Sequence, residues 1–120
     1  MNQPILITMG DAAGIGPEII VKAFIDSPAD LVDCVVFGDV AVLRRASALI
    51  AASRQTLAWP VAQLDSLADV ATVPPHCIGV LQSCDLSMLP PYGQINALAG
   101  QAAADCIVRA VRAVLAGEAR

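Results

Sequence analysis

The segment from Gly10 to Glu18 has the residue types and spacing of a ligand-binding turn. It reads Gly-Asp-Ala-Ala-Gly-Ile-Gly-Pro-Glu and directly follows the apolar run Pro4 to Met9. Glycines permit positive φ angles and close approach of a ligand, and a helix that begins at Pro17 presents unpaired N–H groups. Asp11 follows the first predicted strand, where open α/β sheets usually bind ligands. The segment predicts either a site for an anionic or strongly polar group or a tight turn that binds nothing.

Other chemically capable residues give weaker predictions. The spacing of the glycines is not that of the GxGxxG dinucleotide fingerprint, so a Rossmann domain is not supported. Arg109 and Arg112 are able to attract a phosphate, but beside Asp105 they are typical of a solvated helix face, and Asp105 is expected to pair with Arg109 four residues on. His76 is interpreted as structural or solvent-facing. The cysteines form no CxxC pair and are interpreted as reduced thiols, with a disulfide framework or zinc site as the alternative. They are Cys34, Cys77, Cys84 and Cys106.

The elements that must position these residues alternate between strands and helices. The predicted strands are Pro4 to Met9, Asp33 to Phe37, a short Thr56 to Trp59, and His76 to Leu81. The predicted helices are Pro17 to Ile25, one capped by Asp39 that runs through Ile50, and Asn96 to Ala116. Val61 to Pro75 is predicted to be a loop with at most one helical turn, and Ser87 to Asn96 an irregular connection. This order indicates an α/β fold, a largely parallel sheet with helices on both faces.

Composition excludes two classes of protein. Hydrophobic residues make up 57% of the 120 residues and charged residues only 15%, with a mean hydropathy of +0.67. The most apolar stretch, Ala97 to Ala116, is interrupted by three charges, so it does not predict a membrane span. A net charge of −4 without a basic patch argues against a nucleic-acid partner. The apolar excess favours surface that faces more protein, either later chain or another subunit.

The N-terminus lacks a secretory signal pattern, which favours a cytoplasmic location.

Several of these segments together resemble a known family. The stretch from Met9 to Ile20, MGDAAGIGPEII, resembles the signature of the 4-hydroxythreonine-4-phosphate dehydrogenase family, except that Ala12 stands where the family usually has proline. Val35 to Asp39 and Gly93 to Asn96 are similar to later parts of that family. The shorter core Gly-Ile-Gly-Pro-Glu is also similar to the isocitrate and isopropylmalate dehydrogenases.

The resemblance implies an isocitrate/isopropylmalate dehydrogenase-like fold that is incomplete in this chain. Residues 1–120 are expected to be the N-terminal part of a two-domain dehydrogenase, with the catalytic remainder absent and no catalytic residue present. Asp11, Gly14 and Ile15 are expected to contact the cofactor, NAD or NADP. The family also uses a divalent metal such as Zn, Mg or Co, held by three histidines, and none of these is expected here because His76 is the single histidine and matches none of those motifs. A homodimer is expected.

The implied reaction is oxidation of a phosphorylated secondary alcohol by NAD, assisted by the metal and followed by decarboxylation. The first candidate substrate is 4-hydroxythreonine 4-phosphate, in pyridoxal phosphate biosynthesis. Within the same family, a four-carbon acid phosphate of the threonate or erythronate type, or a dihydrodiol, is an alternative substrate. An alternative of a different class is a non-catalytic α/β module that binds a partner through its apolar face.

Overall fold

A four-stranded parallel sheet forms the centre of the computed structural model, which describes residues 3–120. The strands are β1 (Ile5–Thr8), β2 (Cys34–Gly38), β3 (Val61–Leu64) and β4 (Ile78–Gln82), in the order β1-β2-β4-β3. Ile5 lies opposite Cys34, and Val36 lies opposite Val80. The chain therefore steps outward from β1 through β2 to β3 and returns to insert β4 between β2 and β3.

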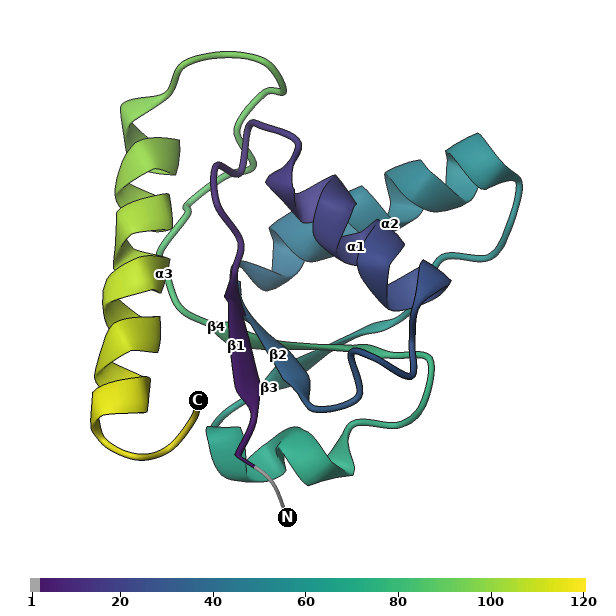
Figure 1. Cartoon of the computed structure of the whole chain (residues 1–120). Coiled ribbons are helices and arrows are strands. Elements are labelled where there is room, and N and C mark those ends of the chain that lie inside the picture. Colours follow the sequence, from purple (N-terminus) through teal and green to yellow (C-terminus); the bar gives the residue numbers. More distant parts are fainter. Residues whose placement is uncertain (1–2) are drawn as a thin grey trace.

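Helices cover both faces of the sheet, as the sequence predicts (Figure 1). The helices α1 (Gly16–Asp26) and α2 (Val40–Arg54) lie on one face, and α3 (Ala97–Leu115) lies on the other. A short 3-10 helix, η1 (Leu67–Thr72), packs on the same face as α3. Crossovers between parallel strands are right-handed, so the steps outward place α1 and α2 on one face, and the return step to β4 places η1 on the opposite one.

The core has two layers because neighbouring residues of each central strand point to opposite faces. Val36 and Val80 pack with Leu43 of α2 on one side, whereas Val35 and Phe37 pack against α3 on the other. Both faces of β2 are thus buried, which explains its uninterrupted apolar sequence.

No helix among residues 3–120 combines the length and the apolar character needed to cross a membrane.

The sequence prediction was wrong about the third strand. Thr56 to Trp59 is irregular, and Leu57 is 92% exposed. The strand is instead Val61–Leu64, within the stretch predicted to be a loop; its ends are buried while Gln63 is exposed. Four residues at a sheet edge give too short an alternation to stand out in the sequence. The helical turn predicted in the remainder of Val61 to Pro75 is present as η1, whose six residues make about two turns of 3-10 helix.

The N-cap of α2 is confirmed. The Asp39 carboxylate accepts a hydrogen bond from the Val42 amide at 3.0 Å and another from the Gln82 side-chain amide at 2.8 Å, and Asp39 is only 6% exposed.

Asp39→Ala is expected to lower the free energy of unfolding by about 1–2 kcal/mol, because α2 loses its cap and Gln82 loses its acceptor. Urea unfolding measures the change. Asp39→Asn keeps an accepting oxygen and serves as the control, which should lose less. An Asp39→Ala variant as stable as the unmodified chain would contradict this account.

Candidate functional site

Polar residues follow or end three of the strands at one edge of the sheet. Asp11 follows β1, Asp39 follows β2, and Gln82 ends β4. Because the strands are parallel, their carboxyl ends meet at this edge, where open α/β sheets bind ligands. The edge is therefore the candidate site.

The turn after β1 is fixed by its own hydrogen bonds and leaves Asp11 exposed. Gly10 has φ of +77°, a conformation that favours glycine. The Gly14 amide donates to the Asp11 carbonyl at 3.0 Å, and the Ala13 amide donates to Asp11 Oδ1 at 2.8 Å. Ala12 and Ala13 are buried beneath the turn, while Asp11 lies on the surface. The turn thus holds the Asp11 carboxylate in a defined direction toward solvent.

The other two residues predicted to contact the cofactor lie beside Asp11. Ile15 is 69% exposed, and Gly14 is half-buried. Ile15 is the N-cap of α1, and no side chain caps that helix. Pro17 has no N–H, so the Gly16 and Glu18 amides are the donors that the start of this helix offers to a ligand. Glu18 is in the first turn, so two carboxylates, those of Asp11 and Glu18, flank the turn; they favour a hydroxyl or amide donor over a phosphate.

The connection from β4 to α3 packs over this turn, and Arg45 of α2 holds it there. The Arg45 guanidinium donates to the Pro90 carbonyl at 2.6 Å and to the Ala12 carbonyl at 3.0 Å. It also stacks on the Tyr92 ring, 4.0 Å from the ring centroid. The Gly93 amide donates to the turn at the Ala13 carbonyl, at 2.8 Å. The irregular connection predicted for Ser87 to Asn96 is confirmed, and it forms one wall of the candidate site.

A second network joins the ends of β2 and β4. Gln82 accepts a hydrogen bond from the Val40 amide at 2.9 Å and donates to Asp39 and to the Cys84 carbonyl. The Arg109 guanidinium donates to the Gln82 carbonyl at 2.7 Å. These contacts tie α3 to the edge that carries Asp39.

Two thiols, Cys84 and Cys106, lie against each other behind the site. The hydrogen bond from Cys84 to Cys106 raises the pKa of Cys84, and burial raises it further. Cys84 therefore keeps its proton at neutral pH, whereas the same hydrogen bond lowers the pKa of Cys106, whose side chain is fully buried. All four cysteines are free thiols in the structure.

The predicted ion pair between Asp105 and Arg109 is wrong. Asp105 accepts a hydrogen bond from Gln101 at 2.8 Å, whereas Arg109 turns to the Gln82 carbonyl. Arg109 and Arg112 line a cavity of about 430 Å³ that also contains Asp65 and Glu118. The two acids offset the two arginines, so this cavity is not a built phosphate site.

His76 lies far from the turn, exposed and stacked on Trp59. Within residues 3–120, no three His, Cys, Asp or Glu side chains group closely enough to hold a metal ion.

Comparison with known proteins shows which enzymes the whole chain resembles. No protein-family model matches the chain. A 4-hydroxythreonine-4-phosphate dehydrogenase of Beijerinckia indica is 35% identical over 111 residues, which are 92% of this chain and 31% of that protein. A D-threonate 4-phosphate dehydrogenase of Pectobacterium atrosepticum is 35% identical over 98% of this chain and 35% of its own length. The crystal structure of a 4-hydroxythreonine-4-phosphate dehydrogenase from Klebsiella pneumoniae superposes with a TM-score of 0.84 at 35% identity. It is matched over 98% of this chain and 35% of its own.

Over its own length, the chain is similar to 4-hydroxythreonine-4-phosphate dehydrogenases. It spans about one third of the length of the curated relatives that it matches. The resemblance read from the Met9 to Ile20 stretch is therefore confirmed, and the parallel sheet with its helices matches about a third of a solved 4-hydroxythreonine-4-phosphate dehydrogenase.

Sequence reasoning missed two residues that shape the candidate site, Gln82 and Arg45. Gln82 carried a usable signal, since it is a polar residue that ends an apolar strand beside the predicted edge. Arg45 carried none, because its partners Ala12 and Pro90 are 33 and 45 residues away.

Proposed function

We propose that the chain forms one wall of the nucleotide cleft of an NAD-dependent dehydrogenase. The observation that carries this proposal is the exposed Asp11 beside the uncapped start of α1, at the carboxyl edge of the sheet. In this proposal Asp11 accepts hydrogen bonds from hydroxyl groups of the cofactor, Gly14 allows its close approach, and Ile15 packs against an apolar face of it. NAD, when bound, supplies the acceptor for a hydride.

The reaction we propose for the whole protein is oxidation of 4-hydroxythreonine 4-phosphate, with loss of carbon dioxide from the product. D-threonate 4-phosphate is the second candidate substrate, because a dehydrogenase named for it is as similar to this chain as the first relative. A divalent metal belongs to the proposed chemistry, but no residue among 3–120 is assigned to it, because these residues contain no suitable group of ligands.

We also propose that more protein covers the outer face of α3, in a homodimeric enzyme. Its exposed side chains include Ile107, Val111 and Leu115, which is 82% exposed. These positions are four residues apart and form an apolar stripe, which supports a covered surface.

The nucleotide proposal is tested by NMR titration of the chain with NAD. We expect millimolar NAD to shift the amide signals of Gly10, Gly14 and Ile15, and Asp11→Asn to reduce these shifts severalfold. Inorganic pyrophosphate alone is expected to leave these amide signals unshifted, because the carboxylates of Asp11 and Glu18 repel it.

Asp30→Asn is the matched control, since Asp30 is also exposed but lies in the turn after α1. It should bind NAD like the unmodified chain. The proposal is contradicted if NAD shifts only amide signals elsewhere in the molecule, or shifts none. The turn would then have a purely structural role, and the non-catalytic interaction module would be favoured.

A further inference from the structure

A second cavity opens at the opposite edge of the sheet, where the strands begin. Its volume is about 410 Å³, within the range of small-molecule sites. Cys34 begins β2, Cys77 directly precedes β4, and Trp59 lies just before β3. The cavity is therefore separated from Asp11 by the length of the strands, and the proposed nucleotide cleft does not use it.

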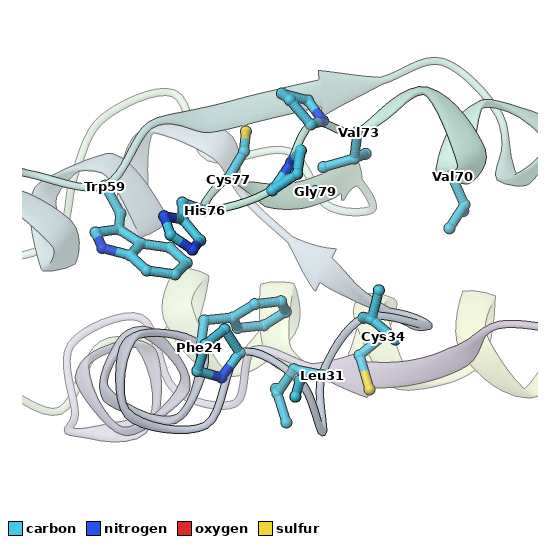
Figure 2. Close-up of a pocket in the computed structure, with 14 residues that line it drawn as sticks. Phe24, Leu31, Cys34, Trp59, Val70, Val73, His76, Cys77 and Gly79 are labelled. Carbon is cyan, nitrogen blue, oxygen red and sulfur yellow. The ribbon is translucent and has the colours of Figure 1, made fainter.

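The walls of this cavity are aromatic and aliphatic (Figure 2). Trp59 and His76 stack with their ring centroids 5.1 Å apart and their planes 25° apart. Phe24 lies across the cavity from this pair, and Leu31 and Val73 extend the two walls. A flat ring inserted here meets ring faces and side-chain methyl groups, an arrangement that favours aromatic stacking.

The lining carries no acidic or basic side chain other than His76. Burial raises the pKa of both Cys34 and Cys77, so these thiols stay uncharged. A charged ligand would lose its hydration here without gaining a counter-ion. The lining therefore selects an uncharged ligand, with the His76 ring nitrogens available to bind one polar substituent.

Local contacts hold both walls in place before any ligand binds. Ser47 Oγ donates to the Trp59 carbonyl at 2.8 Å, and the Ile78 amide donates to the Pro60 carbonyl at 2.9 Å. On the other wall, the Cys34 amide donates to the Leu31 carbonyl at 3.0 Å. A cavity fixed in this way binds a rigid ligand at a low cost in conformational entropy.

His76 is held in a conformation that its side chain disfavours. Its φ is +59°, in the left-handed region, and it follows two prolines. Such a backbone costs on the order of 1 kcal/mol for a residue with a side chain, and residues of this kind cluster at ligand sites. Here the conformation sets the imidazole ring against Trp59.

We propose that this cavity binds a small, flat, uncharged aromatic molecule, which stacks in the wall formed by Trp59 and His76. This site is independent of the nucleotide proposal, because it shares none of its residues with the Gly10 to Gly16 turn.

The test uses the only tryptophan of the chain as its reporter. The neutral probe N-phenyl-1-naphthylamine absorbs where tryptophan emits, so a probe bound beside Trp59 quenches it by energy transfer. We expect saturable quenching with one probe per chain. Ala29→Phe, which places a ring at the rim of the cavity, should weaken binding at least tenfold, whereas Ala48→Phe on the exposed face of α2 should leave it unchanged.

His76→Gly is the second variant, because it removes the stacked ring while glycine relieves the positive φ. It should unfold no more easily than the unmodified chain and still bind the probe severalfold more weakly. The proposal is overturned if quenching does not saturate, if Ala29→Phe and Ala48→Phe bind alike, or if His76→Gly binds at full affinity. If the probe bound to the exposed face of α3 instead, Ala29→Phe and Ala48→Phe would bind it equally well.

Discussion

Gly16→Ala is expected to destabilise the chain by about 1–3 kcal/mol, the cost of forcing extra volume into a packed site. A Cβ at this position would lie 2.6 Å from the carbonyl oxygen of Met9, which is backbone and does not move aside like a flexible side chain. The start of α1 must then shift away from the end of β1, and the turn that carries Asp11 must shift with it. Urea unfolding measures the loss, and the NAD-induced shift of the Ile15 amide should disappear.

Gly100→Ala is the matched control for this change. Gly100 lies within α3, and a Cβ there would meet no atom within 4 Å. Alanine is favoured over glycine inside a helix by roughly 0.5–1 kcal/mol, so this variant should become more stable. If both variants moved stability in the same direction, the close contact with Met9 would not be the cause.

Arg45→Met is expected to cost roughly 2–3 kcal/mol of stability and to release the connection before α3. The substitution keeps an apolar stem but removes hydrogen bonds to two carbonyls, each worth about 1.5–3 kcal/mol when the donor is charged. It also removes the stacking on Tyr92. The expected loss is smaller than the sum of the two hydrogen bonds. The buried Arg45 Nε has no hydrogen-bond partner among the described residues, and this unpaired donor already costs some stability in the unmodified chain. Faster hydrogen exchange of the Gly93 amide should accompany the loss.

Arg44→Met tests whether the effect belongs to the contacts or to the lost charge. Arg44 is the preceding residue, carries the same charge, and makes one longer hydrogen bond, 3.3 Å to the Val61 carbonyl. It is exposed, so its loss should cost less than about 1 kcal/mol and leave the Gly93 amide protected. Equal losses for the two variants would refute the role given to Arg45.

These variants also indicate how far the sequence predicts this molecule. The Gly10 to Glu18 turn and the Asp39 cap were predictable because each depends on neighbours within a few residues. The contact between Gly16 and Met9 is equally local, but residue types and spacing do not encode how closely the two backbones approach. β3 escaped prediction because its four residues form a strand only by pairing with β4.

The candidate site shows the same limit. Asp11, Gly14 and Ile15 were predicted from one segment, and their role in binding stays a prediction; Asp11 and Ile15 are exposed, and Gly14 is half-buried. Arg45 and Gln82 shape that site through partners about 30 to 45 residues away, and no local pattern encodes such contacts. Asp105 and Arg109 illustrate the reverse error, in which favourable helical spacing was overruled by a carbonyl group on the neighbouring strand.

The insertion of β4 between β2 and β3 also constrains the order in which the chain folds. β1 pairs with β2 across the single helix α1, and β3 pairs with β4 across the short segment that contains η1, whereas β4 pairs with β2 across α2, β3 and η1. That pairing brings Val36 to Val80 and closes a long loop, a step with a high entropic cost that slows folding. The pairing of β2 with β4 is therefore expected to form last, and it joins a unit of β1, α1 and β2 to a unit of β3 and β4.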